Sequence, residues 1–172
     1  MDEITIKRIQ KVHPKLRDEL LADYIHVNNK LLGKGERLRF PYTTRTRKEQ
    51  EDLYAQGRTK PGKKVTNALW YQTYHLENYA LAFDIVLLYD LDGNGTFETA
   101  SWDMKKDHDK DGKSDWMTVV NYFKSKGWKW GGDFTKLPDS PHFEKTFGYH
   151  WKDLKEKLDK KDFIKGTTYV NI

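Results

Sequence analysis

The sequence predicts an α+β fold in which helices pack on a small, mainly antiparallel sheet. Two patterns carry this prediction. Apolar side chains recur at three- and four-residue steps between residues 14 and 31, as on one face of a helix. From Tyr79 to Tyr89 the chain is almost continuously apolar, which indicates a buried strand. The 172 residues are about the size of one domain, so we expect residues 1–172 to form a single domain.

Local signals place the elements of the first half of the chain. Pro14 suits the first position of the first helix, and Gly33 suits its end. The apolar residues Leu38, Phe40 and Tyr42 then alternate with polar ones, which predicts a strand.

A capping box begins the second predicted helix, because Thr46 is followed by Glu49, and the helix runs toward Gly57. Residues 58–68 are predicted to be a basic loop. The later elements predicted are a third helix at 116–123 that Gly127 ends, short strands at 128–130 and 142–144, and a charged helix from Trp151.

Charge is unevenly distributed along the chain. The net charge is +5, but residues 90–115 carry eight acidic and four basic side chains, and the other residues carry 27 basic and 18 acidic ones. A cationic body suits an anionic partner, and an acidic insertion suits a cation. The Lys and Arg residues are scattered and match no recognition motif, so we expect no nucleic-acid partner.

The composition also excludes several chemistries. Cysteine is absent, which rules out disulfides, a Cys nucleophile and Cys-ligated metal centres. The longest apolar run, Ile85 to Tyr89, is far too short to cross a membrane. The N-terminus MDEITIKRIQ has no signal-peptide core, so we expect the protein to be made in the cytoplasm and to need release to act elsewhere. We also expect it to be a monomer.

His75 and Asp84 form the first candidate pair. Asp84 interrupts an apolar run, where a buried carboxylate is costly unless a cation or hydrogen bonds compensate it. If the chain reverses in a hairpin between them, the two side chains can face each other from neighbouring strands. The alternative is a buried Asp that caps a turn and a surface His.

Asp139 and His142 form the second candidate pair. Pro138 and Pro141 make a helix unfavourable there, so the segment is expected to be extended and rigid. It can present a ligand and a general base together, or it can be a plain surface turn. Two His and one Asp are a known ligand set for a catalytic zinc, which keeps a fourth position for water.

These motifs together resemble the zinc peptidoglycan peptidases that include phage L-alanyl-D-glutamate endolysins and D-alanyl-D-alanine carboxypeptidases. Their signature is [ST]-x-H-x-x-G-x-A-x-D followed by [DE]-x-x-H. Thr73, His75, Ala82 and Asp84 match the first motif, and Asp139 and His142 match the second. TRTRKEQ resembles the family's YRTxxEQ, and KVTNA and GWKWGGDF resemble the endolysin branch.

The resemblance implies a role for each of five residues. His75, Asp84 and His142 would bind zinc. Asp139 would be the general base that takes a proton from the attacking water, and Arg45 would hold the substrate and stabilise the developing oxyanion. Without the other motifs, TRTRKEQ would be only a capped, charged helix start.

The chain departs from the family pattern between His75 and Asp84. The Asp follows the His by seven positions in the family and by nine here, and Ala80 replaces the family's Gly if Leu76 and Glu77 are the extra residues. An even insertion preserves strand parity, so both ligands can face one side of a hairpin. The Cβ of Ala80 disfavours a positive φ.

The acidic insertion contains two loops with the spacing of calcium ligands. Both match D-x-D-x-[DN]-G-x-x-[DE], although position 12 is Ser101 or Thr118 rather than Glu. The alternatives are solvated Asp/Gly turns and a cap of the third helix by Asp115. The candidate calcium ligands are Asp90, Asp92, Asn94 and Glu98 in the first loop, and Asp107, Asp109, Asp111 and Asp115 in the second.

The resemblance implies a zinc endopeptidase that cleaves the L-Ala–D-Glu bond of peptidoglycan stem peptides, as a phage lysin does after release from the host cytoplasm. Two alternatives stay open. One is a D-Ala–D-Ala carboxypeptidase, and the other is a non-catalytic wall-binding or calcium-binding module that kept the fold.

Overall fold

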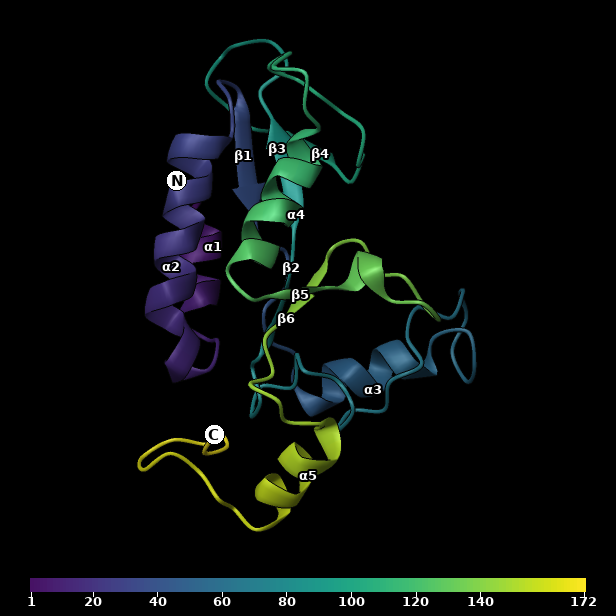
Figure 1. The fold of residues 1–172 in the computed structure, drawn as a ribbon. Coiled ribbons are helices and arrows are strands. Elements are labelled where there is room, and N and C mark those ends of the chain that lie inside the picture. The colour runs from purple at the N-terminus through teal and green to yellow at the C-terminus, as the bar shows by residue number, and fades with distance from the viewer.

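The computed structural model describes residues 1–172 and confirms the predicted α+β class (Figure 1). Six strands form two small antiparallel sheets, and one hydrophobic core of 23 buried residues lies among the helices and sheets. The helices α1, α2 and α4 lie beside the first sheet (Figure 1), and the hydroxyl of Tyr122 on α4 donates to the carboxylate of Asp23 on α2. No helix is both long enough and apolar enough to cross a membrane.

The first sheet has the strand order β1-β3-β4 and the second has the order β2-β6-β5. Their strands are β1 (Glu36–Arg39), β2 (Ala82–Asp84), β3 (Val86–Tyr89), β4 (Thr99–Ser101), β5 (Lys129–Trp130) and β6 (His142–Glu144). The short strands expected at 128–130 and 142–144 are therefore confirmed as β5 and β6. The strand β4 inside the acidic insertion was not predicted.

The apolar run 79–89 is buried as predicted, but it is not one strand. It is divided at Ile85 into β2 and β3, which belong to different sheets. The backbone N–H of Ile85 donates to the carbonyl of Pro141, and beyond it β3 pairs with β1 instead of β6. Burial alone cannot show this change of partner, because buried residues continue on both sides of Ile85.

The helices are α1 (Glu3–Ile9), α2 (Arg17–His26), α3 (Arg47–Ala55), α4 (Asp115–Ser125) and α5 (Trp151–Asp159). The predicted first helix is a continuous series of a 3-10 turn at Pro14–Leu16, α2, and a π-helical turn at Val27–Leu31. The helix α1 was missed, because its residues show little apolar periodicity.

Capping residues explain where three of these helices begin. The capping box between Thr46 and Glu49 is present at α3, as predicted. The side chain of Asp2 accepts from Thr5 at the start of α1. The expected alternative of Asp115 as the cap of α4 is wrong, because the hydroxyl of Ser114 accepts from Met117 there and Asp115 is the first helical residue.

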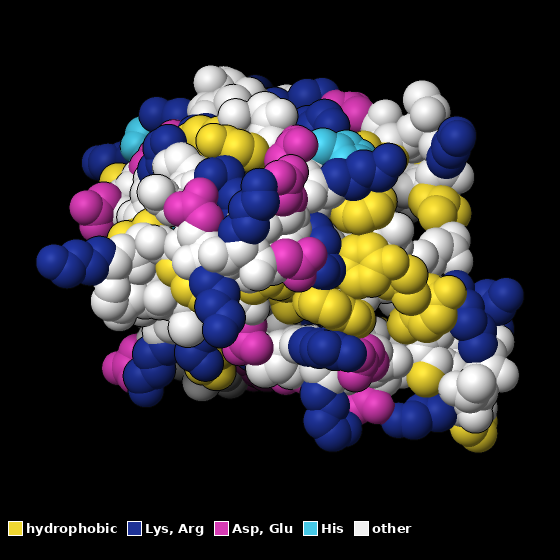
Figure 2. Space-filling view, turned by 90° about the horizontal axis from the view of Figure 1, so that it is seen from below, with side chains coloured by type: hydrophobic (Ala, Val, Ile, Leu, Met, Phe, Trp, Pro, Cys, Tyr) yellow, Lys and Arg dark blue, Asp and Glu magenta, His cyan; other side chains and the backbone are white.

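The strand predicted over Leu38, Phe40 and Tyr42 lies earlier than expected. It ends at Arg39, because the N–H of Phe40 donates to the hydroxyl of Thr5 and Pro41 has no N–H to continue the ladder. Basic side chains are spread over the face shown in Figure 2, among acidic and hydrophobic ones, and do not form one continuous stripe.

Candidate metal centre

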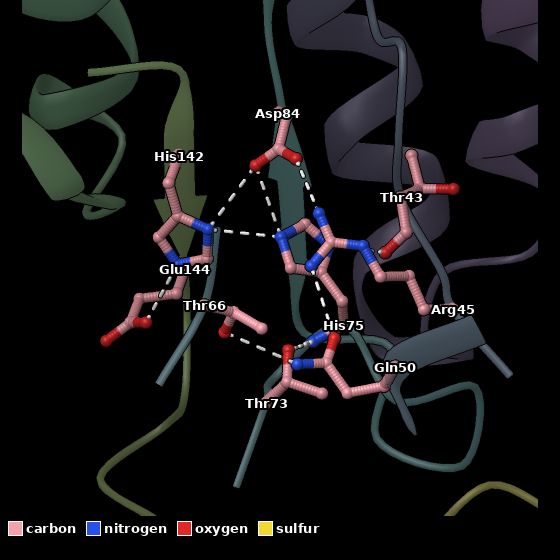
Figure 3. Close-up of polar contacts among 9 residues, drawn as sticks. All are labelled: Thr43, Arg45, Gln50, Thr66, Thr73, His75, Asp84, His142 and Glu144. Atoms are coloured by element: carbon pink, nitrogen blue, oxygen red, sulfur yellow. Dashed lines mark hydrogen bonds and ion pairs between the residues drawn. The ribbon is translucent and has the colours of Figure 1, made fainter. Parts of the chain in front are cut away.

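Three side-chain atoms from His75, Asp84 and His142 converge at the junction between β2, β6 and the preceding turn (Figure 3). The Nε2 atom of His75 lies 3.1 Å from Nδ1 of His142 and 3.2 Å from Oδ1 of Asp84. The Nδ1 atom of His142 lies 3.4 Å from the same Asp84 oxygen. We call these three residues the donor triangle.

The second sheet fixes one side of the donor triangle. Asp84 at the end of β2 is the register partner of His142 at the start of β6. His75 does not lie on a strand, and the predicted hairpin between His75 and Asp84 is wrong. His75 comes from a turn whose residue Leu76 forms a bridge with Arg45, so the parity of the two-residue insertion does not decide which way the imidazole points.

Two backbone contacts and one side-chain contact hold the imidazole of His75 in place. Its Nδ1 lies 3.1 Å from the carbonyl oxygen of Thr43, and its backbone N–H donates to the hydroxyl of Thr73. The N–H of Arg45 donates to the carbonyl of His75 at 2.7 Å. With the Nδ1 proton donated to Thr43, the Nε2 lone pair is directed into the donor triangle.

Glu144 is the hydrogen-bond acceptor that orients His142, as the carbonyl of Thr43 is for His75. The sequence analysis did not identify it. Its Oε2 lies 3.0 Å from Nε2 of His142, which leaves Nδ1 for the donor triangle. Glu144 is 7% exposed and stands two residues after His142 on β6. The signal was available, since residues i and i+2 of a strand share one face.

Arg45 contacts the donor triangle through Asp84. One guanidinium nitrogen lies 3.1 Å from Oδ2 of Asp84, and another lies 3.4 Å from the side-chain oxygen of Gln50. The buried Gln50 amide in turn donates to the carbonyl of Ala68, which ties α3 to the loop that borders the site. The Nε atom of Arg45 is buried and has no partner.

These contacts shift the acid–base equilibria of the site. Burial raises the pKa of Asp84, but the two imidazoles outweigh it and hold that pKa well below its usual range. Burial lowers the pKa of His75. For His142 the effect of burial is reversed by the hydrogen bonds to Asp84 and Glu144, which raise its pKa to about 9.

Asp139 lies on the loop before β6, beside a cavity of about 670 Å³. The cavity is also lined by Arg45, His75, His142 and the loop residues 64–68. Burial raises the pKa of Asp139, and the negative charge of Asp84 adds to this effect. A raised pKa suits a general base that must take a proton and then return it near neutral pH.

Gly131 allows the Asp139 loop to approach. The N–H of Asp139 donates to the carbonyl of Gly131 at 2.9 Å. A Cβ on Gly131 would collide with the carbonyl oxygen of Asp139 and would lie 3.0 Å from Cβ of His142. The second Gly of the segment GWKWGGDF, Gly131, is therefore required by close packing against the site.

Ala80 adopts the conformation that its Cβ disfavours. Its φ is +51°, and the residue is fully buried. Its N–H donates to the carbonyl of Leu76, and its carbonyl accepts from His13. The turn that carries His75 thus holds a residue with a Cβ in the left-handed region, at a cost of about 1 kcal/mol in backbone strain.

The donor triangle fits a metal ion. Tetrahedral zinc at about 2.0–2.1 Å from its ligands places the ligand atoms about 3.3 Å apart, close to the three separations found here. Both imidazoles also have an acceptor on the nitrogen that faces away, as metal-binding His residues do. Two nitrogens and one carboxylate oxygen are a donor set that zinc accepts.

The two acidic loops differ. In the second loop the carboxylates of Asp107, Asp109 and Asp111 converge, and Asp109 and Asp115 also meet Glu36 of β1. In the first loop the third position of this set is Asn94, whose N–H donates to the carboxylates of both Asp90 and Asp92, and no group of three carboxylates forms there.

Comparison with known proteins adds independent information about the segment that carries the donor triangle. A peptidase M15 family model, described as D-alanyl-D-alanine carboxypeptidase, matches residues 70–145. The chain resembles the M15 peptidases, as its motifs predict. The matched residues include the whole donor triangle and Asp139, while Arg45 lies outside them. Peptidases of this family are metallopeptidases, in agreement with a triangle that could bind a metal.

Two individual proteins are also similar to this chain. The peptidoglycan L-alanyl-D-glutamate endopeptidase CwlK of Bacillus subtilis (strain 168) is 46% identical over 100 residues, which make up 58% of this chain and 55% of CwlK. The match thus spans about half the length of that relative. The crystal structure of the Serratia marcescens L-Ala D-Glu endopeptidase ChiX has a TM-score of 0.53 at 20% identity, over 84% of this chain and 87% of ChiX, and shows likeness of fold.

Proposed function

We propose that the chain is a zinc-dependent endopeptidase that hydrolyses the L-Ala–D-Glu bond of peptidoglycan stem peptides. The observation that carries the proposal is the donor triangle beside a cavity that Asp139 and Arg45 also line. The identity to CwlK supports the choice of bond. The cationic charge outside residues 90–115 suits the anionic wall polymer in which such peptides occur.

Each residue of the site has a part in this proposal. His75, Asp84 and His142 would hold the zinc ion, which would supply Lewis-acid chemistry and lower the pKa of water to about 7. Asp139 takes a proton from the attacking water and delivers it to the leaving amine.

Arg45 has two parts in the same proposal. Its contact with Asp84 orients that carboxylate, and its guanidinium lines the cavity, where it can donate to the substrate carbonyl as negative charge develops. The loop residues 64–68, which Gln50 anchors, also line the cavity and would border the bound peptide.

Digestion of purified peptidoglycan tests the bond. The zinc-loaded chain should release fragments that carry a new N-terminal D-Glu, identified by mass spectrometry after amine labelling. Release of free D-Ala instead would favour the carboxypeptidase alternative, which the description of the matched family model supports. If no peptide is released and His75→Ala does not change lysis, the non-catalytic alternative replaces the enzyme.

We also propose the setting of a phage-type lysin, on the strength of the KVTNA and GWKWGGDF segments that resemble the endolysin branch. Cells that express the chain should stay intact until their membrane is permeabilised, and should then lose turbidity quickly. Lysis without permeabilisation would contradict this setting, and so would intact cells after permeabilisation if the purified chain digests isolated walls.

A further inference from the structure

The second acidic loop is folded around its own carboxylates. The carboxylate of Asp107 accepts from the backbone N–H groups of Asp111 and Gly112 at 3.1 and 3.0 Å. The carboxylate of Asp111 accepts from Lys113 at 2.8 Å. Carboxylate oxygens of Asp107, Asp109 and Asp111 lie within 4.8 Å of one another, so the first three candidate ligand positions face a common point.

Glu36 of β1 reaches this loop from a distant part of the sequence. Its Oε2 accepts from the N–H of Gly33 at 2.9 Å, while its Oε1 is buried and has no hydrogen-bond partner. The residue is only 6% exposed. Its carboxylate lies with those of Asp109 and Asp115 in a group whose oxygens are all within 4.8 Å, so the unpartnered oxygen belongs to a side chain directed at the loop.

The negative charge of this group is not neutralised by the protein. None of Glu36, Asp109 and Asp115 forms an ion pair with Lys, Arg or His. Asp115 accepts only from the hydroxyl of Tyr89 and the N–H of His108. Two buried carboxylates side by side are unfavourable unless a proton or a cation compensates them.

We propose that Glu36 completes a Ca²⁺ site with the second acidic loop, in place of the Glu that the loop lacks at position 12, where Thr118 stands. Calcium binds six to eight oxygen ligands and prefers carboxylates and carbonyls. The oxygen-only donors separate this site from the His-rich donor triangle, which suits zinc. The site would join β1, the second loop and the start of α4.

The turn before β1 is shaped for this contact. A Cβ on Gly33 would collide with Cβ and Oδ2 of Asp109, so only Gly at this position lets the loop lie against the turn.

The first acidic loop provides the internal comparison. Asp90 accepts from the N–H groups of Asn94 and Gly95 just as Asp107 does from Asp111 and Gly112. The local fold is therefore the same in both loops. In the second loop Glu36 joins Asp109 and Asp115, whereas no carboxylate from elsewhere in the chain forms such a group of three with acidic residues of the first loop, so the proposal places one calcium ion at the second loop.

Calcium titration of the full, zinc-supplemented chain tests the site. Isothermal titration calorimetry with CaCl₂ should give one site for the wild type and a rise in melting temperature. Glu36→Gln, which keeps the shape of the side chain, should weaken calcium binding at least tenfold. The matched control Asp92→Asn, at the same loop position as Asp109 but in the first loop, should bind within about twofold of the wild type.

Circular dichroism in a calcium-free buffer should show that each variant is folded. Asp109→Asn is a second variant that removes a proposed calcium ligand. The proposal is overturned if the wild type binds no calcium at several millimolar. It is also overturned if Glu36→Gln and Asp109→Asn bind as tightly as the wild type, or if Asp92→Asn abolishes binding. The zinc content and peptidase activity of calcium-free protein report separately on the donor triangle.

Discussion

Asp84 and His142 face each other as register partners in the antiparallel pair of β2 and β6, with Oδ1 and Nδ1 3.4 Å apart. Backbone pairing thus places two of the three proposed zinc ligands, and only His75 depends on a turn. The second-sphere contacts then decide which nitrogen of each imidazole is directed at the metal.

Removal of the Glu144 carboxylate should weaken zinc binding. Glu144→Gln keeps the size of the side chain but replaces the charged acceptor of the His142 Nε2–H, so we expect a 10- to 100-fold loss of zinc affinity, measured by competition with a chelating dye. Lys129→Ala is the control, because Lys129 lies 3.7 Å from the other Glu144 oxygen and is exposed. Equal zinc affinity in Glu144→Gln and wild type would contradict a role of Glu144 in zinc binding.

Ala80→Gly should stabilise the protein. Glycine adopts the positive φ of this position without strain, so the free energy of unfolding in urea should rise by about 1 kcal/mol. Ala100→Gly on the exposed strand β4 is the control, and should destabilise by about 0.5–1 kcal/mol through chain entropy alone. A loss of stability in Ala80→Gly would show that the buried methyl group outweighs the strain.

Gly131→Ala should reduce peptidoglycan hydrolysis by more than its loss of folding stability explains. The added Cβ pushes on the carbonyl of Asp139 and on His142, so the general base and one ligand move together. We expect at least a tenfold loss of peptidoglycan hydrolysis at a temperature where the variant is folded. Gly148→Ala is the control: Gly148 has a positive φ, which Gly131 lacks, but open space around it, so this variant should lose stability without losing activity per folded molecule. Parallel losses in both variants would contradict the packing argument.

The pH dependence of stability should report on Glu36. Burial, aided by the charges of Asp115 and Asp109, raises the pKa of Glu36 from 4.5 to about 7 in the folded, cation-free chain. The folded state then holds a proton that the unfolded state has lost, so the free energy of unfolding falls as the pH rises from about 4.5 to 7.

Glu36→Gln removes that proton equilibrium. Urea unfolding in EDTA at pH 5 and pH 7.5 should show a larger decrease for the wild type than for Glu36→Gln, by as much as about 3 kcal/mol. Identical decreases in the two proteins would contradict the assignment of this pH dependence to Glu36.

The sequence was sufficient for several local elements and for the three residues that the structure brings together in the donor triangle. Helix caps such as Thr46 with Glu49, and the short aromatic strands, depend on neighbours in the chain and were predicted correctly. The three donor residues were found through motif spacing, which reflects a shared three-dimensional arrangement.

What the sequence did not reveal depends on contacts between distant segments. The division of the run 79–89 at Ile85 follows from a change of strand partner. The meeting of Glu36 with the second acidic loop joins residues more than 70 positions apart in the chain. No local pattern encodes either contact.

Metal analysis of the purified wild type beside His142→Ala tests the central claim most directly. We predict one zinc per chain in the wild type and a loss of nearly all of it in His142→Ala, with the fold verified by circular dichroism. His26→Ala is the control, since His26 lies outside the donor triangle, and it should keep its zinc. A wild type that binds no zinc, or a His142→Ala variant that retains one zinc per chain, would contradict the account.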